Sequence, residues 1–397
     1  MFRLATGPHN SHVWPSPEQS LLLDAALKPA EAAARAFREW QTVVDVREDF
    51  DWQNLRLLPL VYSNLRAHGV DDPLMPRLRG VYRRTWAEMQ TLLHRVEPVV
   101  RALREANIPV LLLKGAPLSL TYYRNAAHRP MTDFDFAVPR DDAWHAVRAL
   151  QALGWQPSSP MSDERIKWFH ALQFFHPSGG ELDLHFHVMA ETTVGETDHF
   201  FWDTAEVLSF RGHAVSMLAP TELLFHTIIH GVRWNYASPI RWIPDALTVL
   251  AQRGSEIDWN VIALLAERLR VTHRVGLGAT YLATQHGVEI PEHVLRRLTS
   301  HRVDWKERLE ASVLLTDRSS EPKHFLMFYY QLLADFARVC EPRASMVTFL
   351  WEYPKYLCYR LNVRSRRELL PIALRGMANH LGLRPRQAQI AHAKAHA

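Results

Sequence analysis

The spacing of hydrophobic positions changes twice along this chain and divides it into three regions. From residue 15 to about 106, apolar side chains recur every three or four residues, which is typical of amphipathic helices. Between 108 and 188, short apolar runs of strand length alternate with helical stretches. Helical spacing returns from about 220. The pattern predicts an N-terminal helical region, a mixed core and a C-terminal helical region, at 1–105, 106–219 and 220–397.

The central region carries the strand signals. Residues 108–115 (IPVLLLKG) are apolar without alternation, which is typical of a strand buried on both faces. Residues 131–139 alternate Asp with Phe, and the runs 172–177 and 181–188 flank a Ser-Gly-Gly turn that predicts a hairpin. Helical stretches at 116–123 and 143–153 lie between them. This order predicts an α+β fold.

Local signals also predict features of single helices. Pro98 lies inside the helix expected at 76–106 and should kink it or mark a boundary. Asp141 and Asp142 are expected to cap the helix at 143–153, and Thr221 the helix at 222–232.

Composition excludes several classes of protein. Of the 397 residues, 47% are hydrophobic and 22% charged, which favours a globular chain over a disordered one. No run reaches the ~18 apolar residues of a membrane span, and the first residues lack a signal-peptide pattern. The two cysteines, Cys340 and Cys358, cannot build a disulfide framework. We therefore expect a cytoplasmic protein of bacterial type with no membrane span.

The positive charge gathers at one end of the chain. Residues 360–397 contain eight Arg or Lys and one acid, Glu368, so they carry +7 while the whole chain carries +4. A solvated arginine-rich helix is the simplest explanation. Contact with RNA, an anionic lipid or an acidic partner stays open.

Three aspartates form the main candidate for chemistry. Residues i and i+2 of a strand point to the same face with Cα atoms ~6.5 Å apart, so Asp133 and Asp135 project together. Asp183 lies on a later strand-like run, and the three carboxylates share one patch if the two strands are neighbours. Such a group needs a compensating cation, and oxygen ligands favour Mg²⁺ or Mn²⁺.

A possible phosphate site lies just upstream. Gly115 is placed where a strand turns into a helix, and backbone amides at such a turn bind anions. Lys114, Gly115 and Ala116 would form the turn, and Lys114 and Arg129 are the nearest basic residues for a triphosphate.

Together these motifs resemble the nucleotidyltransferase superfamily of the DNA polymerase β type, and in particular its large bacterial branch with few characterised members. That branch has a Leu-Lys-Gly turn, a Tyr eight residues later, an Arg-Pro-Met-x-Asp-x-Asp stretch and a hydrophobic-Asp-hydrophobic-His strand. This chain has LLLKG at 111–115, Tyr123, RPMTDFDF at 129–136 and LDLH at 182–185. The stretch RWIPDALTVL at 241–250 also resembles the branch. The resemblance covers roughly residues 85–300.

The resemblance implies a mixed sheet of about five strands and metal-dependent transfer of a nucleoside monophosphate from an NTP, ATP by default. The acceptor would be a hydroxyl on a small molecule, peptide or glycan intermediate, and pyrophosphate would leave. Asp133 and Asp135 would bind Mg²⁺ or Mn²⁺, and Asp183 would be a metal ligand or the base. The family's usual Gly-Ser or Gly-Gly turn is Gly115-Ala116 here, so the serine hydroxyl that would touch a phosphate is missing.

Other functions stay open. The Gly-Ala turn is compatible with a catalytically inactive binding or scaffold protein of the same fold. Four histidines, His185, His187, His226 and His230, suggest zinc, although the HExxH glutamate is absent. A nucleic-acid acceptor is possible but not favoured, because basic charge does not gather beside the core. Trp234, Tyr236 and Trp242 are candidates to line the acceptor pocket.

Overall fold

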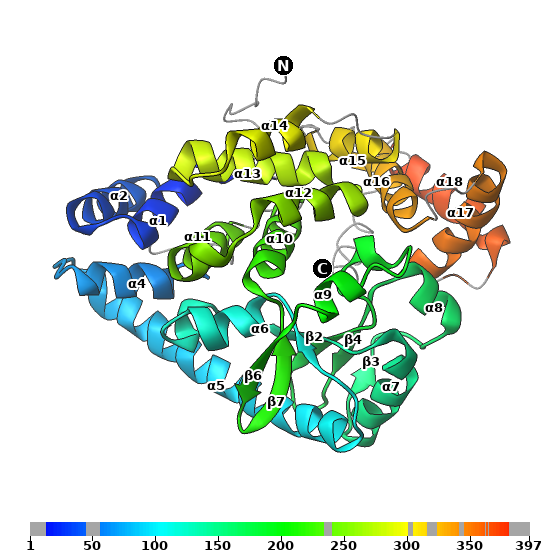
Figure 1. Ribbon diagram of the computed structural model, residues 1–397, viewed down its shortest axis with the longest axis horizontal. Coiled ribbons are helices and arrows are strands. Elements are labelled where there is room, and N and C mark those ends of the chain that lie inside the picture. Colours follow the sequence, from blue (N-terminus) through cyan, green and yellow to red (C-terminus); the bar gives the residue numbers. More distant parts are fainter. Residues whose placement is uncertain are drawn as a thin grey trace.

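A computed structural model gives the architecture of the protein. It describes residues 13–44, 56–233, 240–300, 305–315, 324–340, 345–361, 363 and 365–380. Trp234 and Tyr236 lie outside these residues. A mixed sheet occupies the middle of the chain, and helices from both ends of the chain pack around it (Figure 1). The predicted α+β class is confirmed.

The sheet has seven strands in the order β3-β4-β5-β2-β1-β7-β6, where the resemblance implied about five. Two pairs of neighbours, β2 with β5 and β1 with β7, are parallel, and the others are antiparallel. The strands are β1 (Leu111–Leu112), β2 (Asp133–Ala137), β3 (Gln156–Pro157), β4 (Ala171–Phe175), β5 (Glu181–His185), β6 (Glu206–Phe210) and β7 (His213–Met217).

The β6–β7 hairpin was missed by the sequence analysis, although it carries a turn signal. Arg211 and Gly212 join the two strands, and both have positive φ angles, of 50° and 91°. A two-residue turn of this kind suits the twist of a hairpin. The signal was weak because Arg rather than Asn or Asp precedes the glycine.

One face of the sheet is covered by α5 (Met75–Glu105) and α7 (Ala143–Ala152). Val96, Val99 and Val100 of α5 pack in one core with Phe134 and Phe136 of β2. The helix α5 continues through Pro98, so the proline marks no boundary. We attribute this to burial on both sides of Pro98, which offsets the ~3 kcal/mol cost of an interior proline.

A second core joins the N-terminal helices to the helices that follow the sheet. Figure 1 shows these helices stacked above the sheet. They are α1 (Pro17–Leu27), α2 (Ala30–Val43), α4 (Leu58–Ala67), α10 (Pro220–Gly231), α11 (Trp242–Arg253), α12 (Trp259–Arg268), α13 (Thr272–His286) and α14 (Glu292–Ser300).

The predicted cap at Thr221 is wrong, because Thr221 lies inside α10, whose N-cap is Ala219. The Thr221 hydroxyl donates instead to the Glu256 carbonyl 3.2 Å away. Asp142 is the N-cap residue of α7 as predicted, but its side chain makes no capping hydrogen bond. Asp141 lies in the 3-10 turn Arg140–Asp142 that precedes the helix.

A third core lies beside the β4–β5 end of the sheet. It packs Trp168 at the end of α8 (Asp163–Trp168) against Phe336, Phe349 and Tyr356. In the part of the chain that the structure describes, no helix is long and apolar enough to cross a membrane. The helices of this end are α15 (Trp305–Leu315), α16 (His324–Val339), α17 (Met346–Arg360) and α18 (Leu369–His380).

Candidate functional site

A cavity of about 670 Å³ lies between the sheet and the helices on its open side. One wall comes from β2, β5 and the turn after β1, and the other from α10, α11, α13 and the C-terminal helices. Its charged lining includes Arg56, Lys114, Arg129, Asp133, Asp135, Asp183, Glu191, Arg241, Arg274, Glu310, Asp335, Arg338 and Arg360.

Two of the predicted carboxylates meet across neighbouring strands. β2 and β5 run parallel in a register that places Asp135 directly beside Asp183. Phe134 and Phe136 point the other way and are fully buried, as the alternation predicts. His185 joins the pair: one ligand atom from each of Asp135, Asp183 and His185 lies within 4.8 Å of the others.

Asp135 is the better compensated carboxylate of the two. Its Oδ1 pairs with the Lys114 ammonium and lies 3.2 Å from His185 Nε2. Burial alone would raise the pKa of Asp135, but Lys114 and then His185 outweigh it, so the pKa is lowered. The side chain therefore stays ionised.

Asp183 is less well compensated. Its Oδ1 is buried and has no hydrogen-bond partner. Burial and the nearby charge of Asp135 raise the pKa of Asp183 to about 6. A buried carboxylate oxygen beside a second carboxylate lacks a positive ligand, so Asp135, Asp183 and His185 fit a divalent cation.

Asp133 lies apart from this group. It begins β2 at the cavity wall, half-buried, and its Oδ1 lies 3.4 Å from the Thr132 hydroxyl. The Arg56 guanidinium donates to the same hydroxyl at 3.0 Å. His185, rather than Asp133, completes the group whose ligand atoms lie within 4.8 Å of one another, and a metal-binding role for Asp133 stays a prediction.

The turn after β1 brings Lys114 and Gly115 to the cavity but not Ala116. Lys114 has a φ of 52°. A Cβ on Gly115 would come within 2.7 Å of Met131 Sδ, so a larger residue here would displace the Met131 side chain. Ala116 is fully buried, and its amide donates to the Leu113 carbonyl at 3.2 Å. Of the predicted turn, Lys114 and Gly115 line the cavity.

Arg129 lines the cavity in a fixed position. Its Nε lies 2.8 Å from both carboxylate oxygens of Asp245, a buried residue of α11. Tyr123 is buried and donates its hydroxyl to the same carboxylate at 2.9 Å. The partner Asp245 lies in the RWIPDALTVL stretch, so this motif anchors the arginine.

Two further arginines were missed by the sequence analysis. Arg241 lines the cavity at the start of α11 and donates to the Pro130 carbonyl. Burial, and then the charges of Arg129 and Arg56, lower the pKa of Arg241. Three guanidiniums therefore face one part of the cavity, where a bound polyanion would relieve their repulsion. Arg56 is about 185 residues from Arg241 in the chain, so no local motif joins them.

The histidines do not converge on a zinc site. His187 is held by Asp198 at 2.8 Å and by the Ile166 carbonyl at 3.3 Å. His226 and His230 stack with ring centroids 5.9 Å apart, and burial lowers the pKa of His226 to about 3. Among the described residues, the possible metal-binding group contains only His185 of the four. Trp242 is buried beside Gly231 and does not line the cavity.

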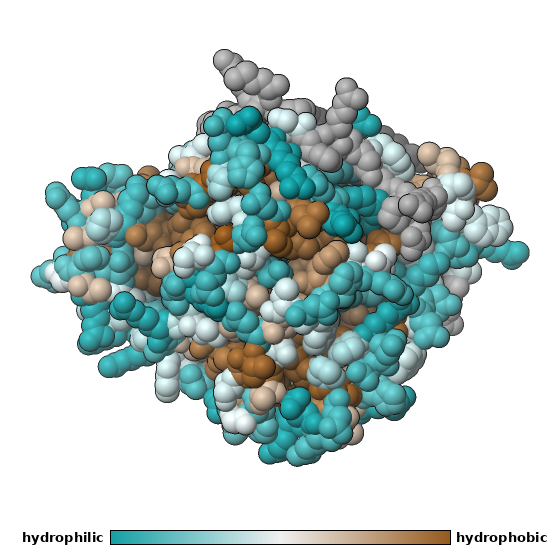
Figure 2. Space-filling view, viewed as in Figure 1, coloured by the Kyte–Doolittle hydropathy of each residue, from teal (hydrophilic) through white to brown (hydrophobic). Residues whose placement is uncertain are grey.

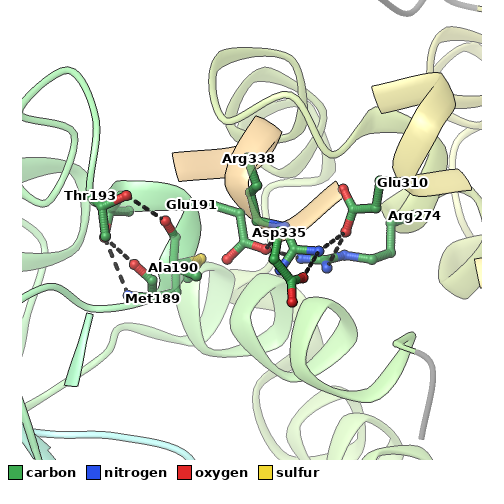
Figure 3. A network of polar contacts seen from close by, with 9 residues as sticks. Met189, Ala190, Glu191, Thr193, Arg274, Glu310, Asp335 and Arg338 are labelled. Atoms are coloured by element: carbon green, nitrogen blue, oxygen red, sulfur yellow. Dashed lines mark hydrogen bonds and ion pairs between the residues drawn. The ribbon is translucent and has the colours of Figure 1, made fainter. Parts of the chain in front are cut away.

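The opposite wall of the cavity holds an ion network from four separate segments (Figure 3). Arg274 of α13 pairs with Glu191, which follows β5, and lies 2.6 Å from Glu310 of α15. Arg338 of α16 lies 2.7 Å from Glu310 and 3.7 Å from Asp335. The network ties the C-terminal helices to the sheet.

Comparison with known protein families gives the class of this protein. Residues 50–286, more than half of the chain, match a family described as uncharacterised nucleotidyltransferase. The chain belongs to this family, as the motifs at 111–115, 129–136 and 182–185 suggested. No curated protein matches the chain.

Two solved structures are similar to part of the chain. One is the solution structure of the antibiotic-resistance factor ANT(2'')-Ia, at 14% identity and a TM-score of 0.32, covering 50% of this chain and 97% of that one. The other is an antigenic nucleotidyltransferase-like protein from Paracoccidioides brasiliensis, at 14% identity and a TM-score of 0.34, covering 52% and 92%. The family assignment rests on the sequence match.

Proposed function

We propose that this protein is an active, metal-dependent nucleotidyltransferase that moves a nucleoside monophosphate from an NTP to a hydroxyl acceptor. The observation that carries the proposal is the unpartnered Asp183 oxygen beside Asp135, facing a cavity rich in arginine. The Asp183 oxygen has no cationic partner, and Arg129, Arg241 and Arg56 bring positive charge to the same cavity. A metal-bound triphosphate would supply a cation to Asp183 and an anion to these arginines.

Each side chain of the cluster has a distinct task. Asp135 and Asp183, with His185 beside them, would hold Mg²⁺ or Mn²⁺, which when bound neutralises charge on the reacting phosphate. Lys114 keeps Asp135 ionised and in place. Asp183 accepts the proton of the acceptor hydroxyl, whose oxygen bonds to the α-phosphorus while the bond to pyrophosphate breaks.

The arginines would hold the rest of the triphosphate. Arg129 is fixed by Asp245, so it presents its guanidinium without losing side-chain freedom on binding. Arg241 and Arg56 extend the positive surface from outside the sheet, and Gly115 leaves room for the phosphates. This division keeps the cationic side of the cavity for the leaving pyrophosphate.

The acceptor would enter on the side of the C-terminal helices. Trp168, Phe169 and Tyr356 line that side together with Asp335. The mixture of aromatic and polar groups suits a hydroxylated small molecule, a peptide or a glycan intermediate better than a duplex nucleic acid. The choice among these acceptors stays open.

The test is a thermal-shift screen of the four NTPs, each with and without Mg²⁺ or Mn²⁺, followed by assay of pyrophosphate release. A ligand at 100 times its Kd stabilises by about 2.7 kcal/mol, which is readily measured. We expect metal-dependent stabilisation by at least one NTP in the wild type and in Asp141→Asn, an exposed control. Asp135→Asn should lose it. Absence of stabilisation by every NTP would favour the scaffold interpretation.

A further inference from the structure

The helix α17 carries apolar side chains on two faces, although one face suffices to pack it. Phe349 and Tyr356 are buried, and their rings contact Phe336 of α16 in tilted pairs with centroids 4.7 and 5.2 Å away. Val347 and Leu350, on another face, are 78% and 63% exposed. A helix that is apolar on a second face is expected to bury that face against something else.

The exposed face continues onto α18. Of the fifteen large hydrophobic residues exposed in the described chain, seven belong to α17 and α18. The two helices lie side by side at one corner of the molecule (Figure 1), and Figure 2 shows hydrophobic surface reaching that corner. We call this surface the α17–α18 patch; its members are Met346, Val347, Leu350, Trp351, Tyr359, Leu370 and Leu374.

The ionic surroundings of the patch are positive. The Arg366 guanidinium lies over the Trp351 ring, 5.1 Å from its centroid, and Arg367 beside it is exposed. Glu352, the one acid of α17, is already bonded to Lys355 at 2.6 Å and Lys167 at 3.1 Å. A binding partner of complementary charge at this corner would therefore be an anionic surface.

We propose that the α17–α18 patch docks the protein onto an anionic lipid surface, with both helices lying in the interface. In-plane helices with Trp and Leu on one side and arginines at the rim bind such surfaces by combining apolar burial with electrostatic attraction. The patch forms an outer corner rather than a groove, and the cavity lies elsewhere. A lipid surface accepts a protruding corner without needing a complementary shape.

The test uses the full-length protein and two kinds of vesicle, phosphatidylcholine alone and phosphatidylcholine with phosphatidylglycerol. We expect sedimentation with the anionic vesicles only, weakening as salt rises. The double variant Val347→Glu/Leu350→Glu should lower the partition coefficient at least about tenfold, because each charge opposes burial in the interface. Val207→Glu is the matched control, since Val207 of β6 is also 78% exposed and lies far along the chain from the patch.

A second variant guards against misfolding. Arg366→Glu/Arg367→Glu changes only exposed side chains and should lower anionic-vesicle binding while leaving the melting temperature unchanged. Failure of the wild type to bind anionic vesicles would overturn the proposal, as would binding by both double variants that equals the binding of the wild type. A wild-type dimer that Val347→Glu/Leu350→Glu makes monomeric, without vesicle binding, would assign the patch to self-association. RNA binding that ignores the apolar substitutions, without vesicle binding, would assign the tail to nucleic acid instead.

Discussion

Two clusters of buried charge face the same cavity, and they differ in how well their charges are matched. In the network on the helical wall, Arg274 and Arg338 pair with Glu191 and Glu310. Asp335 is less well compensated, because it lies 3.7 Å from Arg338 and burial raises its pKa. Glu191 is the best matched carboxylate of this wall. Burial would raise the pKa of Glu191, but the two arginines outweigh it and lower the pKa to about 2. The ionised form of Glu191 is therefore more stable, relative to the protonated form, in the folded protein than in water.

The cluster on the sheet wall is matched only in part. Lys114 and His185 both pair with Asp135, whereas the Asp183 Oδ1 has no hydrogen-bond partner. The pKa of Asp183 is accordingly raised to about 6. A matched cluster stabilises the fold, whereas a carboxylate kept in an unfavourable place indicates a binding site whose cation comes from outside.

The largest effect is expected on catalysis. Asp135→Asn should lower pyrophosphate release on the order of 10⁴-fold, equivalent to about 5 kcal/mol of transition-state stabilisation, because it removes a carboxylate from the metal group. The melting temperature should also fall, because the buried Lys114 ammonium loses its partner, so turnover is compared well below the melting temperature of each variant. Asp141→Asn removes an exposed carboxylate from the 3-10 turn before α7, and this variant should keep full turnover. Equal turnover in both variants would contradict the assignment of Asp135 to the metal-binding group.

The next effect is on stability. Arg274→Ala should lower the free energy of unfolding by about 3–5 kcal/mol, because it leaves Glu191 buried beside only one arginine. Chemical denaturation measures the change. The control Arg297→Ala breaks a two-bonded but more exposed pair with Glu267 and should cost about 1 kcal/mol or less. Similar losses in both variants would remove the distinction between network and surface pair.

Acidification should weaken the helical wall. The unfolded chain protonates Glu191 near pH 4.5 and the folded chain only near 2, so stability present above pH 4.5 is lost between these values. The loss amounts to about 3 kcal/mol, from a difference of about 2.5 pKa units. His226, whose pKa is lowered to about 3, adds an earlier decline that starts near pH 6.5. Denaturation at a series of pH values should show less loss below 4.5 in Glu191→Gln than in the wild type.

The smallest effect sharpens the comparison most. Asp183→Asn should leave the stability of the metal-free protein unchanged or raise it by about 1 kcal/mol, because it removes an unfavourable buried charge. Thermal denaturation in the presence of a chelator measures this. A loss comparable to that of Arg274→Ala would mean that Asp183 is a structural residue.

Much of the sheet wall could be predicted from the sequence because its causes are local. Because side chains alternate along a strand, Asp135 points to the opposite face of β2 from Phe134 and Phe136. In β5, Asp183 likewise points away from the face of its two leucine neighbours. The glycine at 115 leaves room for the Met131 side chain, and its place between strand and helix is visible as a motif. The family resemblance rested on these same short segments.

The helical wall and the arginine side could not be predicted in this way. Arg241, Arg274 and Arg338 come from separate helices, and helical spacing tells which face is apolar but not which helices become neighbours. Whether a charged residue ends as a solvated surface group or as part of a buried network depends on that packing. The hydrophobic pattern therefore predicted the strands that carry Asp135 and Asp183 and their facing, and the short motifs predicted the class of the protein. The matching of charges, which distinguishes Asp183 from Glu191, arose only when distant segments met around the cavity, because a charge pair depends on distance in space.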